Sequence, residues 1–273
     1  MLVPNVITLL AICAGLTAIR LSIEGKMELA LAAIVFAALL DGIDGRIARA
    51  IKGQSKFGAE LDSLADFVNF GVVPGILLYF WQLKDLGNVG WICAIFYAIC
   101  GGLRLARFNA AIDDPNRPAF AAGYFTGVPA PAGAIVVLMP VYLSFINMPQ
   151  FPALLTAIYT LGIGILMVSR LPVYSGKTIG SRVEPDKVLP LVLVVVGVIA
   201  LLIAYPWHVL AVCTVIYLLA LPLSWLAYRR AAEQAAQQGA ASVTTPLPTG
   251  DDTAEIAGQS SADASSERPT RLN

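Results

Sequence analysis

Four aspartates stand close together in a chain that is otherwise mostly apolar. Asp41 and Asp44 are three residues apart, and Asp62 and Asp66 are four residues apart. On helices, either spacing places both side chains on one face. Ionised carboxylates are costly at membrane depth, so they pair, bind ions or line a wet cavity. Four of them in one small volume would repel each other unless cations held them together, which predicts a site for hard divalent metals, Mg²⁺ or Mn²⁺, as two ions.

Small and basic residues lie between and beside the two aspartate pairs. Two bound cations would present positive charge to a pyrophosphate and polarise its phosphorus. Glycine and alanine would let a phosphate or nucleotide approach the backbone closely, and arginine is a fork donor suited to phosphate oxygens. The residues that we expect to contact such a ligand are Gly45, Ala48, Arg49, Ser55, Lys56 and Gly58. For the two basic residues, ordinary charge at the inner face of a membrane is the alternative.

The composition places the chain in a membrane. Hydrophobic residues make up 58% of it and charged residues only 13%, whereas soluble domains carry about a quarter charged residues. The formal net charge is zero, so bulk charge gives no reason to expect a nucleic-acid partner. Runs of apolar residues this long are candidate membrane spans.

These runs predict an all-α fold, a polytopic membrane bundle of about eight transmembrane helices, because helices satisfy their own backbone in lipid. The membrane domain covers residues 1–230. The tail, residues 231–273, is rich in Ala, Gln, Ser and Thr and is predicted to be disordered, although its start could continue the last helix for a few turns. The expected spans are 5–22, 27–45, 60–81, 89–107, 121–146, 152–169, 188–205 and 208–228.

Basic residues predict the orientation of the bundle. Of the connections between spans, those on one side hold most of the lysines and arginines, and the other side holds only Arg20, Lys26 and Lys84. Positive charge marks the cytoplasmic face. Both termini and the aspartates, at the ends of the second and third spans, are therefore expected on the cytoplasmic side of the cell's inner membrane.

The stretch from Asp41 to Asp66 reads D-x2-D-G-x2-A-R-x8-G-x3-D-x3-D. This pattern resembles the CDP-alcohol phosphotransferase family, whose members join an alcohol to a phosphatidyl group from a CDP-linked lipid and release CMP. The resemblance implies that Asp41, Asp44 and Asp62 are metal ligands. It also implies that Asp66 is the catalytic general base and touches metal, and that the protein forms a homodimer.

Other segments resemble the integral membrane phosphatidylserine synthase branch of that family. They are ADFVNFGVVPG (65–75), GGLRLARFNAA (101–111), FTGVPAPAGA (125–134) and LMVSRLPVYSGK (166–177), and the resemblance extends over roughly residues 1–190. It implies that the substrates are CDP-diacylglycerol and L-serine, and that the protein works in contact with membrane lipid. The start PNVITLL also matches the branch, which suggests that Asn5 and Thr8 meet the cytidine.

Serine carries a carboxylate and an ammonium group, and polar residues near the aspartates could bind both. Arg104 and Arg107 could clamp the carboxylate with paired hydrogen bonds. The other residues that we expect to bind serine or to close its pocket are Asn69, Asn109, Tyr174 and Lys177. The arginines also fit the end of a helix at the inner interface, and Asn69 could instead hold helices together.

Two other functions remain open from the sequence. The same chemistry could use another acceptor, such as glycerol phosphate, inositol phosphate or choline. A more distant alternative is an ion-coupled transporter, for which we would expect acidic residues near the middle of the membrane and inverted repeats.

Overall fold

The computed structural model describes residues 2–50, 55–112, 124–169, 171–174, 190, 193, 196–197 and 200–243. The chain falls into two units, Met1–Tyr228 and Arg229–Asn273. Both aspartate pairs lie in the first unit, which is built from helices and one small sheet.

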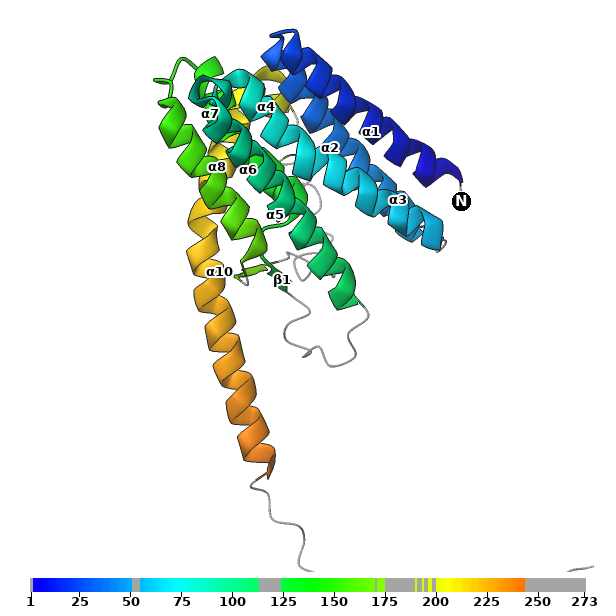
Figure 1. The fold of residues 1–273 in the computed structure, drawn as a ribbon. Coiled ribbons are helices and arrows are strands. Elements are labelled where there is room, and N and C mark those ends of the chain that lie inside the picture. Colours follow the sequence, from blue (N-terminus) through cyan, green and yellow to red (C-terminus); the bar gives the residue numbers. More distant parts are fainter. Residues whose placement is uncertain are drawn as a thin grey trace, which may run out of the picture. The chain divides into compact units, whose positions relative to one another are not determined.

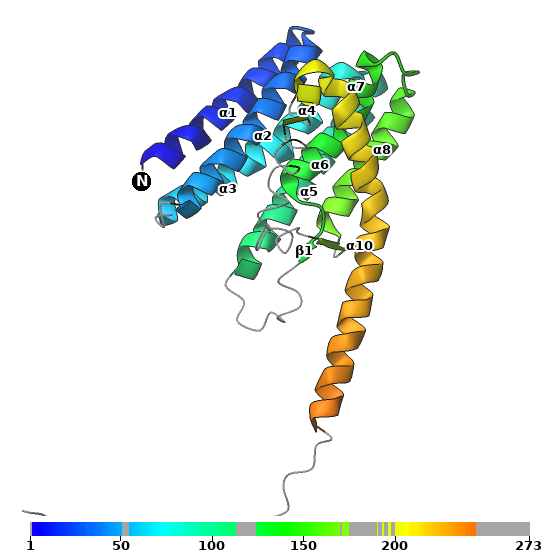
Figure 2. The same cartoon turned by 180° about the vertical axis from the view of Figure 1, so that it is seen from behind.

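The first two helices form a hairpin. Helices α1 (Leu2–Ile23) and α2 (Met27–Ala50) lie side by side along their length (Figures 1 and 2). Gly25 reverses the chain between them at φ +77°, a conformation that a side chain would disfavour. The hairpin returns the end of α2, which carries Asp41 and Asp44, to the beginning of α1.

A continuous helical rod follows, in which a π-helical segment stands between two α-helices. It consists of α3 (Lys56–Asp66), the π-helix η1 (Phe67–Val72) and α4 (Val73–Trp81). π-Helices are rare and occur often at functional sites. Here η1, a single turn that we call the π-turn below, begins directly after the last of the four aspartates.

Helix α5 (Asn88–Ile112) packs against this rod with almost no space between the backbones. A Cβ atom on Gly101 would lie 2.9 Å from the Cα of Gly71, and one on Gly75 would lie 2.8 Å from the carbonyl oxygen of Ala94. No side chain fits at such distances. The glycines therefore allow α5 to approach η1 and α4 closely.

Shorter elements complete the first unit. Two short strands among them, β1 (Tyr124–Thr126) and β2 (Pro172–Tyr174), pair antiparallel, with Tyr124 opposite Tyr174. The all-α fold predicted from the sequence did not include these strands. These elements are η2 (Leu83–Leu86), β1 (Tyr124–Thr126), α6 (Ala130–Val137), α7 (Met139–Phe145), α8 (Ala153–Val168), β2 (Pro172–Tyr174) and the first part of α10 (Pro206–Val243).

The prediction of one helical span over 121–146 is wrong. The segment contains strand β1 and then two short helices that meet at Leu138. Pro140 lies in the first turn of α7, where its missing N–H is tolerated, but it could not continue the hydrogen bonds of α6. The chain therefore breaks the helix at this point.

Four helical stretches among the described residues are long and apolar enough to cross a membrane. The chain is therefore a multi-pass helical membrane protein. Helix α8 is apolar but shorter, with 16 residues, and most of the predicted span 188–205 lies outside the described residues. The four stretches are Pro4–Ile23, Lys56–Trp81, Asn88–Ala111 and Pro206–Arg230.

Helix α10 is longer than the span predicted for it. It continues to Val243, past residue 231, where the sequence predicts the tail to begin. The remainder of the predicted tail, residues 244–273, lies outside the described residues.

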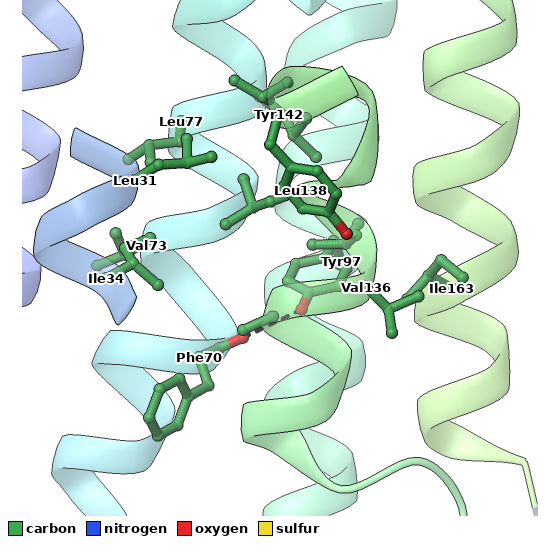
Figure 3. Packing of buried hydrophobic residues seen from close by; sticks show 14 of the residues in the cluster. Leu31, Ile34, Phe70, Val73, Leu77, Tyr97, Val136, Leu138, Tyr142 and Ile163 are labelled. Carbon is green, nitrogen blue, oxygen red and sulfur yellow. Dashed lines mark hydrogen bonds between the residues drawn. The ribbon is translucent and has the colours of Figure 1, made fainter. Parts of the chain in front are cut away.

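A buried apolar core joins the rod to its neighbours (Figure 3). Leu77 and Tyr97 are fully buried in it. The Tyr97 hydroxyl donates to the Phe70 carbonyl oxygen of η1 at 3.1 Å, so α5 holds the π-turn by a hydrogen bond as well as by packing (Figure 3). Elsewhere in the first unit, the hydroxyls of Tyr142 and Thr214 share a hydrogen bond that ties α7 to α10.

Candidate active site

The structure brings the four aspartates together. Asp41 and Asp44 lie towards the end of α2, and Asp62 and Asp66 lie at the end of α3. One carboxylate oxygen from each of Asp41, Asp44 and Asp62 lies within 4.8 Å of the others. The carboxyl group of Asp66 is in hydrogen-bonding contact with Asp41 and interacts electrostatically with Asp62. Two helices that are separate in sequence thus form one acidic cluster.

The first helix contributes a hydrogen bond to this cluster. The Thr8 hydroxyl lies 2.7 Å from Asp44 Oδ2 and 3.0 Å from the carbonyl oxygen of Pro4. It has one proton to donate, and the shorter distance is to the carboxylate. Asp44 is only 2% exposed, so Thr8 helps to fix the direction of a buried carboxylate.

The acidic cluster fits a divalent metal. Oδ1 of Asp44 and Oδ1 of Asp66 are buried, and the described residues offer neither of them a hydrogen-bond donor. Buried carboxylate oxygens without a partner are costly. Carboxylates are the ligands that Mg²⁺ and Mn²⁺ prefer, so a cation held by Asp41, Asp44 and Asp62, with Asp66 beside it, would satisfy this group.

The hydrogen bond from Thr8 should strengthen metal binding. In Thr8→Val the shape of the side chain is kept but the donor is lost, so Asp44 can turn away from its neighbours. We expect the affinity for Mg²⁺ to fall about tenfold, a typical cost of removing a group that orients a metal ligand. Isothermal titration calorimetry of the purified protein in detergent measures this.

Thr17→Val is the matched control for this substitution. Thr17 lies on the same helix, is exposed and donates only to the carbonyl oxygen of Cys13 among the contacts that the structure gives it. Its replacement should leave the affinity unchanged. Equal affinities for the Thr8→Val protein and the wild type would show that Thr8 does not orient Asp44 for a metal.

The beginning of α3 gathers small polar groups near the cluster. Ser55 caps this helix, and its Oγ accepts from the N–H of Gly58 at 3.0 Å. A Cβ atom on Gly58 would lie 2.9 Å from Asn5 Oδ1, so α1 and α3 meet here without a side chain between them. The N–H of Gly58 is already bonded to Ser55. The start of a helix nevertheless favours phosphate through its dipole and its other N–H groups, which suits the binding role expected for these three residues.

The remaining residues expected to contact the phosphates lie on α2 and α3, the two helices that carry the aspartates. Gly45 follows Asp44 directly, and Ala48 and Arg49 lie in the last turn of α2, where the structure describes the backbone alone. Lys56 is exposed at the first position of α3.

Arg104 is a buried cation beside the acidic cluster. It lies on α5 and is 7% exposed. Its guanidinium interacts electrostatically with Asp66 and lies over the ring of Phe108, 5.4 Å from the centroid. Its Nε has no hydrogen-bond partner among the described residues. A buried guanidinium placed in this way can still accept an anionic ligand.

Arg107 and Asn109, the other two residues of α5 that the sequence assigned to serine, bind neighbouring helices. Arg107 donates to the carbonyl oxygen of Val168 in α8, and Asn109 donates to Ser63 Oγ in α3 at 3.0 Å. Both are exposed. Their contacts hold α5 in place, so the structure assigns them a structural task that the sequence did not indicate.

Asn69 packs against the first helix. Its side chain is 1% exposed, and its Oδ1 lies so close to Gly15 that a Cβ atom there would be 2.1 Å away. The contact is one of packing alone, because this oxygen has no hydrogen-bond partner among the described residues. Tyr174 lies in β2, with only its backbone described, and Lys177 lies outside the described residues.

Nothing in the residue pattern indicated that the last helix contributes to the site. Tyr217 of α10 interacts electrostatically with Arg104, and its hydroxyl is buried without a hydrogen-bond partner among the described residues. The only hint in the sequence was that Tyr217 carries a polar hydroxyl inside an otherwise apolar span. Its partner, however, lies more than a hundred residues earlier in the chain.

Together these groups suit the transfer of a phosphorus-centred group. Such reactions depend mainly on positioning and on charge stabilisation. The acidic cluster can hold cations, the beginning of α3 can receive phosphate oxygens, and a carboxylate and a guanidinium remain beside them to handle an incoming alcohol.

Comparison with known proteins agrees with this chemistry. Residues 1–169 match the CDP-alcohol phosphatidyltransferase family, and residues 187–222 match CDP-alcohol phosphatidyltransferase 2. The CDP-diacylglycerol–serine O-phosphatidyltransferase of Mycobacterium tuberculosis is 39% identical, over 83% of this chain and 80% of its own. Proteins of the same name from Helicobacter pylori and Bacillus subtilis are 32% identical over 82% of this chain and 91% of their own, and 39% identical over 62% and 88%, respectively. The chain belongs to the CDP-alcohol phosphatidyltransferase family.

Proposed function

We propose that this protein is a CDP-diacylglycerol–serine O-phosphatidyltransferase, which makes phosphatidylserine and CMP from CDP-diacylglycerol and L-serine. The observation that carries the proposal is the cluster of four carboxylates in a chain that matches CDP-diacylglycerol–serine O-phosphatidyltransferases over most of its length. A transporter is not favoured, because the carboxylates gather at the ends of α2 and α3 and these relatives are transferases.

In this reaction, the serine hydroxyl oxygen forms a bond to the phosphatidyl phosphorus, and the bond from that phosphorus to the CMP oxygen breaks. Divalent ions bound by the acidic cluster would supply the positive charge that polarises the phosphorus and stabilises the leaving CMP. Asp41, Asp44 and Asp62 are the proposed ligands. Thr8 holds the Asp44 carboxylate in place for this task.

Asp66 is the proposed general base. The buried Oδ1 of Asp66 has no donor among the described residues, so it is free to take the proton of the serine hydroxyl. Arg104 interacts electrostatically with Asp66, which places a cation beside the proposed base. Arg104 is also the residue that we propose for the serine carboxylate.

The donor lipid is proposed to lie with its pyrophosphate at the beginning of α3. Asn5, Ser55 and Gly58 meet there, and Arg49 and Lys56 would add positive charge. The basic residues at this end of the bundle support a site that faces the cytoplasm, with both termini on that side. A homodimer is proposed from the family resemblance.

The test is CMP release by the purified protein in mixed micelles of CDP-diacylglycerol, with and without L-serine and with Mg²⁺ or Mn²⁺. We expect release that requires both serine and metal, and phosphatidylserine as the second product. Release with glycerol phosphate, inositol phosphate or choline but not with serine would keep the chemistry of the aspartates and overturn the serine assignment. No release with any alcohol would overturn the proposed function.

A further inference from the structure

Of the six buried side-chain polar atoms that lack hydrogen-bond partners in the described part of the chain, three belong to interacting residues on three different helices. They are Asp66 Oδ1, Arg104 Nε and Tyr217 Oη. Arg104 interacts electrostatically with both of the others. The proposed reaction gives Asp66 a proton to accept, but it assigns no task to the hydroxyl of Tyr217.

The chemistry of the other two groups points to an anion. Arg104 and Tyr217 both carry N–H or O–H donors, and neither donates to any described residue from the orphaned atom. Buried donors without acceptors are costly, and a buried guanidinium is costlier still unless it is paired. Asp66 compensates the charge of Arg104 in part, but it leaves these donor atoms unmatched. A ligand with oxyanion oxygens would accept from both.

We propose that Tyr217 and Arg104 form a paired site for an oxyanion of a substrate, with the Tyr217 hydroxyl determining how tightly that substrate binds. The inference rests on the proposed function and extends it to α10. Two groups in the reactants have this chemistry, the carboxylate of serine and the phosphate of CDP-diacylglycerol. Arg104 interacts electrostatically with Asp66, the proposed general base for the serine hydroxyl. The carboxylate of the same serine molecule is therefore the group that we assign to this site.

The test removes one hydroxyl and follows the two substrates separately. In Tyr217→Phe, we expect the KM for serine to rise about tenfold at saturating CDP-diacylglycerol, the usual cost of losing a hydrogen bond to a charged group. The KM for CDP-diacylglycerol and the melting temperature should change little. Ethanolamine, which lacks the carboxylate, should inhibit the variant and the wild type with equal strength.

Tyr205→Phe is the matched control, because Tyr205 is an exposed tyrosine just before α10 whose ring packs on His208. A rise in the KM for CDP-diacylglycerol alone would assign the site to phosphate instead. Unchanged KM values for both substrates, or equal changes in both together with a lower melting temperature, would overturn the proposal.

A double-mutant cycle gives a second readout that a purely structural role would not produce. If Tyr217 and Arg104 bind one oxyanion, the increases in KM caused by Tyr217→Phe and Arg104→Gln should be less than multiplicative in the double variant. Fully multiplicative effects would overturn the pairing. Absence of serine-dependent release in the wild type would instead overturn the proposed function and the carboxylate assignment with it.

Discussion

Replacement of Asp44 by Asn should lower serine-dependent CMP release by on the order of a hundred- to a thousandfold, the range for loss of one preorganised charge-stabilising group. Asn has the same shape, and its carbonyl oxygen can still accept from Thr8. The substitution therefore removes the negative charge and little else. Initial rates over a Mg²⁺ titration measure the effect, and added metal should restore only part of the loss.

Asp85→Asn makes the same chemical change where no metal is proposed. Asp85 is exposed on η2, beyond the opposite end of the helical rod from Asp62. Its replacement should leave the rate within about twofold of the wild type, because isolated surface substitutions have small effects. An Asp44→Asn rate close to that of this control would show that Asp44 is not a metal ligand.

Replacement of Gly101 by Ala should destabilise the protein by about 1–3 kcal/mol, the usual cost of overpacking. The new methyl group would lie 2.9 Å from the Cα of Gly71, so α5 would have to move away from η1. Arg104 lies one turn further along α5, and its position beside Asp66 would change as well. The melting temperature in detergent and the rate of CMP release should both decrease.

Gly162→Ala separates this steric effect from helix propensity. Gly162 is also inside a helix, α8, but a Cβ atom there would meet nothing within 4 Å. Alanine is favoured over glycine in helices by roughly 1 kcal/mol, so this control should be neutral or slightly stabilising. If the two variants melted at the same temperature, the contact between Gly101 and Gly71 would not limit the packing.

The local parts of the site were accessible from the sequence, because helix spacing alone determines which side chains share a face. The spacing of Asp41 with Asp44, and of Asp62 with Asp66, indicated two acidic faces. Repulsion and the cost of burial then indicated why they should meet around cations. The long apolar runs likewise indicated the membrane class and the approximate limits of α1, α2 and α5, but not the end of α10.

Contacts between distant segments were not accessible in this way. Periodicity can place Thr8 on a face of α1, but it cannot tell that this face meets Asp44, so the sequence assigned Thr8 to a nucleotide. It also treated Arg104 and Arg107 as equivalent, although the packing of α5 buries the first beside Asp66 and turns the second towards α8. The π-turn left no clear mark in the residue pattern.

The order of these groups along the chain has a consequence for biosynthesis. All four aspartates and Thr8 belong to the first 66 residues, whereas Arg104 follows on α5 and Tyr217 only on α10. Chains emerge and fold from the N-terminus onwards. A nascent chain would therefore carry the complete acidic cluster before its compensating arginine is made. Cations could neutralise the cluster during that interval, so the ability to bind metal would precede the ability to bind substrate.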